Sequence, residues 1–111
     1  MSARISARAQ DDLAYIYARL SATAGGDAAD QFLERARQAT SFLAQNPHAG
    51  PHPSWATRHK GLRFWIIRGT RFLIYYFPDE MGVSIERVLD GRRDVRRIME
   101  LGIEDPTDEE E

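Results

Sequence analysis

Residues 61–97, GLRFWIIRGTRFLIYYFPDEMGVSIERVLDGRRDVRR, decide the fold of this chain. They contain three short apolar runs with the length of β-strands, at residues 62–67, 71–77 and 83–89. Gly69-Thr70 separates the first two runs at the spacing of a two-residue hairpin, and residues 78–82 make the next turn. The stretch therefore predicts three consecutive antiparallel strands.

The second run is apolar on both faces, which is typical of a strand in the middle of a sheet. Its faces are formed by Phe72, Ile74 and Tyr76 on one side and by Leu73, Tyr75 and Phe77 on the other. In the third run, simple alternation puts Val83, Ile85, Arg87 and Leu89 on one face and Ser84, Glu86 and Val88 on the other. After Asp90-Gly91, residues 94–99 suit a short final helix with arginines on its outer side.

Two helices are predicted ahead of the strands. The first begins after Ser6, which can cap it, and has an apolar stripe at helical spacing: Leu13, Ile16, Tyr17 and Leu20. The second begins with Asp27 as its N-cap and extends to about Gln45, where Asn46-Pro47 stops it. Residues 3–6 have only the length of a brief edge strand. The pattern predicts an α+β domain: a helical hairpin packed on a small antiparallel β-sheet, with a short C-terminal helix.

Charge divides the chain into two parts. Six of the 17 acidic residues lie in residues 104–111, so residues 1–103 have 15 basic against 11 acidic residues. We expect one domain over residues 1–103 and an acidic, disordered tail over residues 104–111. A mildly basic domain suits an acidic protein partner or a nucleic acid.

Composition argues against cofactor chemistry. The chain has no cysteine, and its three histidines lie in the proline-rich loop at residues 46–60, where no helix is predicted to align them and no carboxylate is present. No nucleotide-binding or hydrolase motif is present. We therefore expect no metal and no cofactor. Because no apolar run reaches the length of a membrane span and no signal peptide is visible, we expect a cytoplasmic protein without membrane contact.

Arginines are the most informative polar residues. Nine lie between residues 58 and 97: Arg58, Arg63, Arg68, Arg71, Arg87, Arg92, Arg93, Arg96 and Arg97. Guanidinium groups hold phosphates and carboxylates through paired hydrogen bonds. Arg71 and Arg92 are candidates for such a site, and the alternative is that they form ion pairs with nearby aspartates and glutamates.

Four segments together resemble the ParE/RelE toxins of type II toxin–antitoxin systems: DLAYIYARL, AADQFLERARQATSFLAQNPHAGP, GLRFWIIRGTRFLIYYF and IERVLDGRRDVRRIM. The resemblance covers residues 5–99. It implies the fold predicted above, with a twisted sheet. RelE-like members are ribosome-dependent mRNA endonucleases, whereas ParE-like members bind and inhibit DNA gyrase.

Residue by residue, the resemblance favours the ParE-like branch. Arg71 and Arg92 match two arginines that would stabilise a phosphate in a nuclease. Arg63 and Trp65, however, stand where nuclease members have lysines, and Ile98 stands near the position of their tyrosine. The resemblance implies a gyrase inhibitor with no catalytic residues, and assigns target contact to Arg92, Arg93, Arg96 and Arg97. The alternatives are a RelE-like nuclease that uses Arg71 and Arg92 on the ribosome with mRNA, and a relative that has lost toxicity.

The family also implies a cognate antitoxin that wraps the toxin. We assign antitoxin contact to three aromatic residues, Tyr15, Tyr17 and Trp65; the alternative is that they belong to the core. A homodimer, or a heterotetramer with the antitoxin, is compatible with this expectation.

Overall fold

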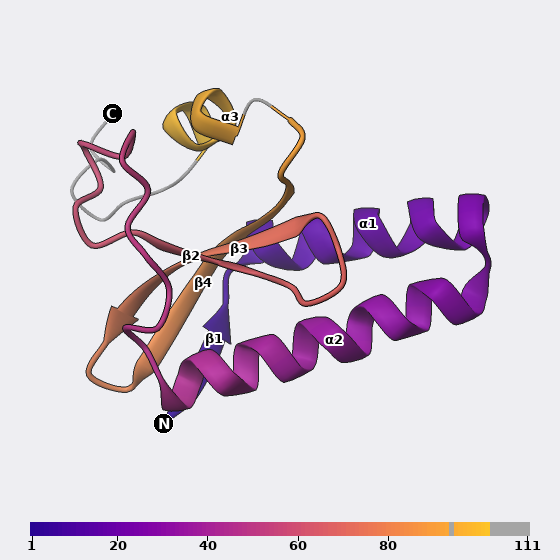
Figure 1. Ribbon diagram of the computed structural model, residues 1–111, viewed down its shortest axis with the longest axis horizontal. Coiled ribbons are helices and arrows are strands. Elements are labelled where there is room, and N and C mark those ends of the chain that lie inside the picture. Colours follow the sequence, from indigo (N-terminus) through magenta and orange to yellow (C-terminus); the bar gives the residue numbers. More distant parts are fainter. Residues whose placement is uncertain (94, 103–111) are drawn as a thin grey trace.

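The computed structural model describes residues 1–93 and 95–102. Its elements follow the order β1 (Ser2–Ile5), α1 (Ala7–Ala24), α2 (Gly26–Gln45), β2 (Arg63–Ile66), β3 (Phe72–Asp79), β4 (Gly82–Asp90) and α3 (Val95–Gly102). The strands form one sheet in the order β1-β4-β3-β2. Figure 1 shows α1 and α2 side by side, with α3 at a distance from both. The α+β class and the helical hairpin are confirmed.

A single residue, Gly25, joins the two helices of the hairpin. Ser6 caps α1 as predicted, since its Oγ accepts a hydrogen bond from the Ala9 N–H at 3.0 Å. Gly25 both ends α1 and caps α2, with a φ of 96° that glycine adopts readily. The prediction of Asp27 as the N-cap was therefore wrong. Asp27 lies in the first turn of α2, where its negative charge still favours the positive end of the helix dipole.

The sheet is mixed, whereas the sequence predicted only antiparallel pairing. β2, β3 and β4 are antiparallel neighbours as expected. β1 pairs parallel to β4, from Ser2 opposite Gly82 to Ile5 opposite Ile85. This arrangement is possible because the chain passes through both helices and two strands before it forms β4, so the first and last strands can point the same way.

A β-bulge changes which residues of β4 share a face. Tyr75 lies opposite Arg87, but Tyr76 lies opposite Ile85, so Glu86 is an extra residue on β4. As a result Val88 joins Val83 and Ile85 in the core under the helices, and Leu89 packs on the other face of the sheet. The simple alternation predicted for this strand was wrong beyond Ile85.

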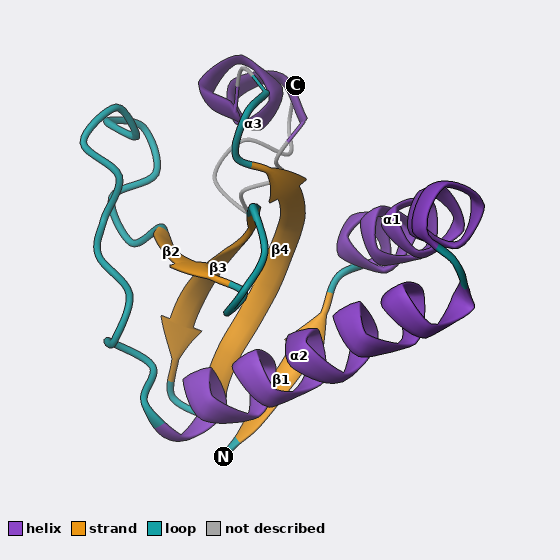
Figure 2. Cartoon of the chain, turned by 45° about the vertical axis from the view of Figure 1, so that its right-hand side comes forward, coloured by secondary structure: helices purple, strands orange, loops and turns teal. Residues whose placement is uncertain are grey.

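Both faces of the sheet are covered, and Figure 2 shows the helical hairpin and the long loop at residues 46–62 on opposite sides of it. The core under the helices includes Phe72, Ile74 and Tyr76. The second core contains Leu62, Tyr75 and Leu89, together with loop residues and the apolar side of α3. Trp55 holds the loop to this core, since its ring lies 6.2 Å from that of Tyr75.

Candidate functional site

Arg71 and Arg92 meet at one carboxylate of the chain itself. The Arg71 Nε donates to Asp90 Oδ2 at 2.8 Å, and Arg92 Nη2 lies 3.5 Å from the same oxygen. The Arg92 backbone N–H donates to Asp90 Oδ1 at 2.9 Å. The two arginines that the sequence offered for a phosphate site therefore do converge, but Asp90 lies between them.

Strand register places these three residues together. Asp90 ends β4 directly opposite Phe72, which begins β3. The Gly91 N–H donates to the Arg71 carbonyl at 2.8 Å, so the chain is held beside Arg71 as it leaves β4. The guanidinium of Arg71 also lies over the Phe72 ring, 4.9 Å from its centroid.

Asp90 remains charged in this setting. Burial by itself raises the pKa of Asp90, but the hydrogen bonds from the Arg92 N–H and the Arg71 guanidinium, with the arginine charges, outweigh burial and lower it. An ionised Asp90 neutralises part of the positive charge of the two arginines. It also presents a negative group to any anion that approaches them.

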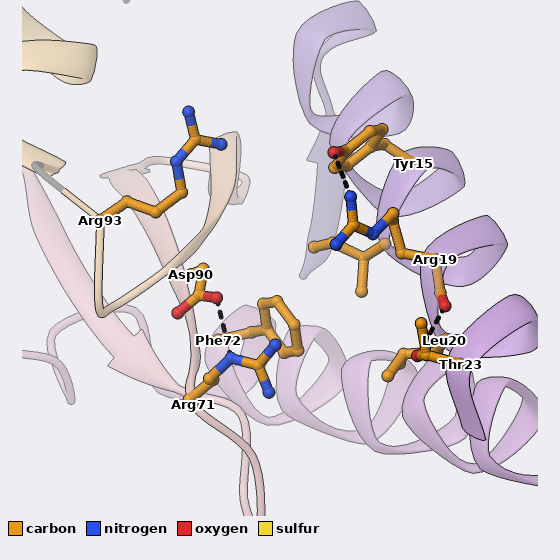
Figure 3. A pocket seen from close by; sticks show the side chains of 9 residues that line it. Tyr15, Arg19, Leu20, Thr23, Arg71, Phe72, Asp90 and Arg93 are labelled. Carbon is orange, nitrogen blue, oxygen red and sulfur yellow. Dashed lines mark hydrogen bonds and ion pairs between the residues drawn. The ribbon is translucent and has the colours of Figure 1, made fainter.

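The arginine cleft lies between α1 and the adjoining ends of β3 and β4 (Figure 3). It has a volume of about 290 Å³ and is lined by Tyr15, Ile16, Arg19, Leu20, Thr23, Arg71, Phe72, Asp90 and Arg93. On the α1 side of the cleft, Arg19 Nη1 donates to the Tyr15 hydroxyl at 3.3 Å, and Tyr15 is 58% exposed. Three guanidinium groups against one carboxylate make the cleft cationic.

The four predicted target-binding arginines are all exposed and lie in one short stretch of the sequence. Arg92 and Arg93 follow β4 directly, and Arg96 and Arg97 lie on α3. Val95 and Ile98 pack into the second core, which orients α3 so that the arginines between them stay at the surface. Arg93 links this segment to the arginine cleft.

The three aromatic residues assigned to antitoxin contact lie in three different settings. Tyr15 lines the arginine cleft. The Tyr17 hydroxyl donates to Asp30 Oδ1 at 2.7 Å and joins α1 to α2; this hydrogen bond and the Asp30 charge raise the pKa of Tyr17. Trp65 stacks on Phe42 of α2 with ring centroids 5.2 Å apart. Tyr15 and Trp65 line two different cavities.

Sequence reasoning missed a hollow between α2 and β2. Its volume is about 510 Å³, and it is lined by Arg35, Gln38, Ala39, Phe42, Trp65, Ile66 and Arg68. Phe42 is 43% exposed and Ile66 is 56% exposed. Phe42 is a large apolar residue that does not belong to the buried face of α2, and an exposed phenylalanine on an amphipathic helix was the available signal.

The positions that match nuclease lysines serve the fold. Arg63 Nη1 donates to the backbone carbonyls of Gly50 at 2.5 Å and His48 at 3.2 Å, which holds the loop against β2. Trp65 is stacked on α2, as described above. Ile98, near the position of the nuclease tyrosine, packs into the second core.

The histidine loop does not gather metal ligands. His52 Nδ1 lies 2.8 Å from the Leu62 carbonyl, His59 is buried edge-on to the Phe77 ring, and His48 is exposed. Within residues 1–93 and 95–102, no three histidine, aspartate or glutamate side chains are placed to hold a metal ion. None of the helices in this part of the chain combines the length and apolarity that crossing a membrane requires.

Comparison with known proteins identifies the family. Residues 3–95 match the family model described as ParE toxin of type II toxin-antitoxin system, parDE. The chain therefore belongs to the ParE toxin family. Its fold is similar to a solved structure described as the chromosomal ParDE TA system from P. aeruginosa, with a TM-score of 0.66 and 20% sequence identity over 79% of this chain and 92% of that chain. No curated protein matches the sequence significantly.

Proposed function

We propose that this chain is a toxin that inhibits DNA gyrase by binding it in the cytoplasm, and that a cognate antitoxin neutralises it. The observation that carries this proposal is the position of Asp90 between Arg71 and Arg92. A phosphoryl-transfer site needs arginines that are free to stabilise negative charge as it develops. Here both candidate arginines already face a carboxylate, which favours binding over catalysis.

Two other positions that a nuclease of this family would use for catalysis have structural roles in this chain. Proton transfer by a positioned base and electrostatic stabilisation each contribute orders of magnitude to an enzymatic rate. Arg63 holds the loop and Ile98 fills the core, so neither is placed to move a proton. These contacts support the ParE-like branch over the ribosome-dependent nuclease.

The exposed arginines of the segment, Arg92, Arg93, Arg96 and Arg97, form the proposed gyrase contact. Arginine is enriched at protein interfaces because its planar group forms several hydrogen bonds and stacks on neighbours. The segment is continuous with the arginine cleft through Arg93, so the contact includes Tyr15 and Arg19 of α1. An antitoxin that covers Tyr15 would cover this part of the contact as well.

A pair of assays on the purified chain tests the proposal. Negative supercoiling by gyrase should fall as the chain is added, while ribosome-bound mRNA stays intact. The double variant Arg93→Gln/Arg97→Gln should inhibit gyrase at least about tenfold less well, because two interface arginines are removed. Arg37→Gln is the matched control, since Arg37 forms only an exposed pair with Glu34.

Two results would overturn the proposal. One is full gyrase activity in the presence of the chain combined with mRNA cleavage on the ribosome. The other is the absence of both effects, together with normal growth when the chain is expressed without an antitoxin, which would mark a relative that has lost toxicity.

A further inference from the structure

The hollow between α2 and β2 has the size and the lining of a small-molecule site. Its volume of about 510 Å³ lies within the range of about 300–1,000 Å³ that is usual for ligand pockets. Its walls combine apolar and aromatic side chains with a few polar ones, as such pockets generally do. It shares no lining residue with the arginine cleft, so it is separate from the proposed gyrase contact.

Phe42 and Trp65 form a flat aromatic wall of this hollow. Their ring centroids lie 5.2 Å apart and their planes are only 23° from parallel. Trp65 holds Phe42 in the stack, yet much of the Phe42 ring stays exposed, and the exposed Ile66 follows Trp65 in β2. A planar ring can therefore continue the stack on Phe42, and nucleobases bind aromatic side chains in this way.

Two arginines at the hollow face no carboxylate. Arg35 Nη1 donates to the Arg68 carbonyl at 3.2 Å, so a neutral backbone group orients the Arg35 guanidinium. Residue 69 must be a glycine for this contact, because a Cβ there would collide with Arg35 Nη1. Within residues 1–93 and 95–102, neither Arg35 nor Arg68 forms an ion pair. Their positive charge therefore remains available to an anion, unlike that of the arginine pair at Asp90.

The two features together select the class of ligand. Guanidinium groups bind phosphates through paired hydrogen bonds, and a flat aromatic wall binds a planar ring. A nucleotide carries both groups on one small molecule. An unpaired nucleic acid strand uses several aromatic platforms in succession, whereas this hollow has a single one, which accommodates one base.

We propose that the hollow between α2 and β2 binds a free nucleotide. The base stacks on Phe42, and the phosphates accept hydrogen bonds from Arg35 and Arg68. Gln38 lines the same hollow, where its amide can bond to the edge of the base. The site is independent of the proposed function, because none of its residues belongs to the proposed gyrase contact.

A nuclear magnetic resonance titration of the ¹⁵N-labelled full chain tests the proposal. The probes are ADP, adenosine, which lacks the phosphates, and pyrophosphate, which lacks the base. ADP should shift the amide signals of Phe42, Ile66 and Arg68 and the Trp65 indole signal until they saturate. Adenosine and pyrophosphate should each bind at least about tenfold more weakly, since each makes only part of the contacts.

Two exposed residues allow the two parts of the site to be tested separately. Arg68→Gln should weaken the binding of ADP at least about tenfold and leave that of adenosine unchanged, because it removes a phosphate contact. Phe42→Ala should weaken both ligands, because it removes the stacking surface. Arg37→Gln and Leu33→Ala are the matched controls, since both residues are exposed on α2 outside the hollow.

Four results would overturn the proposal. Pyrophosphate that binds as tightly as ADP would show that the hollow holds only an anion, and shifts centred on Tyr15 and Arg93 would place ADP in the arginine cleft instead. Tighter binding of a short oligothymidylate than of ADP would assign the hollow to an unpaired strand. The absence of saturable shifts at millimolar ADP would remove the site altogether. The titration contains no gyrase, so a negative supercoiling result would remove the proposed function and leave this site standing.

Discussion

At the scale of single residues, Asp90 determines the chemistry of the arginine pair. It accepts hydrogen bonds from Arg71 and from the Arg92 backbone, and it is only 17% exposed. A carboxylate in this position holds the arginines in place and at the same time occupies the space that an anion would need. The ion-pair alternative weighed for Arg71 and Arg92 is the arrangement that the structure has.

The lowered pKa of Asp90 makes stability depend on acid pH. A group whose pKa is lower in the folded chain than its ordinary value of 3.8 stabilises the fold above that value. The stabilisation is lost as the pH falls from about 4 through the folded pKa. Urea unfolding between pH 7 and pH 2 should show this loss, and Asp90→Asn should reduce it. An unchanged pH dependence in that variant would contradict the assignment; Asp11→Asn, at an exposed site, is the control.

Tyr76 connects the sheet to the long loop. Its side chain is fully buried, and its hydroxyl accepts from the Gly50 N–H at 3.0 Å and donates to the Pro47 carbonyl at 2.9 Å. Gly50 fits against this contact only without a side chain, because a Cβ would lie 2.2 Å from the Phe64 carbonyl oxygen. The close approach of the Phe64 backbone and the Tyr76 hydroxyl thus explains why a glycine stands at position 50.

Removing that hydroxyl should destabilise the chain measurably. Tyr76→Phe leaves the Gly50 N–H and the Pro47 carbonyl without their partner, which costs about 1–3 kcal/mol of unfolding free energy. The exposed Tyr15→Phe should change it by less than about 0.5 kcal/mol. Equilibrium urea unfolding of both variants measures the difference, and equal midpoints would show that the loop is held without Tyr76.

At the scale of elements, α1 completes the edge of β4 that β1 leaves open. β1 is only four residues long and pairs with β4 as far as Ile85. Beyond it, Asp12 of α1 accepts hydrogen bonds from Arg87 Nε at 2.8 Å, Arg87 Nη2 at 3.0 Å and the Val88 N–H at 2.9 Å. The carboxylate takes the place of a further strand residue, and it also holds the helix at a fixed angle to the sheet.

Asp12→Ala should therefore destabilise the fold far more than the same substitution at the neighbouring Asp11. Both partners of the Asp12–Arg87 pair are about 15% exposed, and removing one leaves a charge and a backbone N–H unpaired. We expect a loss of about 2–3 kcal/mol in unfolding free energy, somewhat below the range for a fully buried pair. Asp11→Ala, at the adjacent exposed position, should have almost no effect. Similar losses for the two variants in urea unfolding would contradict this role of Asp12.

At the scale of the whole molecule, the fold separates two surfaces of different character. The helical hairpin and the sheet bring Arg19, Arg71 and Arg93 to one cationic cleft, from parts of the chain far apart in sequence. Phe42 and Ile66 line a separate hollow between α2 and β2.

The exposed arginines predict a strong dependence of gyrase binding on salt. Interactions between exposed charges are screened over about 8–10 Å at physiological ionic strength, so affinity should fall as salt rises. Arg93→Gln/Arg97→Gln should weaken binding at low salt and flatten this dependence, because two of the charges are gone. Surface-binding measurements over a salt series test this. A salt dependence identical to that of the wild-type chain would show that these arginines do not face the target.

Local patterns in the sequence determined most of the elements. The apolar stripe at Leu13, Ile16 and Leu20, the helix stop at Asn46-Pro47 and the two apolar faces of β3 all predicted what the structure has. Each of these signals depends on neighbours within a turn of helix or a few residues of strand. Such neighbours act on the chain whatever the rest of the molecule does, so they are visible in the sequence.

Only the tertiary structure decided the parallel pairing of β1, the bulge at Glu86 and the partners of the arginines. Arg87 pairs with Asp12, 75 residues away, and Arg71 meets Arg92 only because Asp90 lies opposite Phe72 in the sheet. These contacts depend on strand register, and register results from how the whole sheet packs under the helices. A sequence names the charged groups of a site, but the long-range pairing of the strands decides which of them meet.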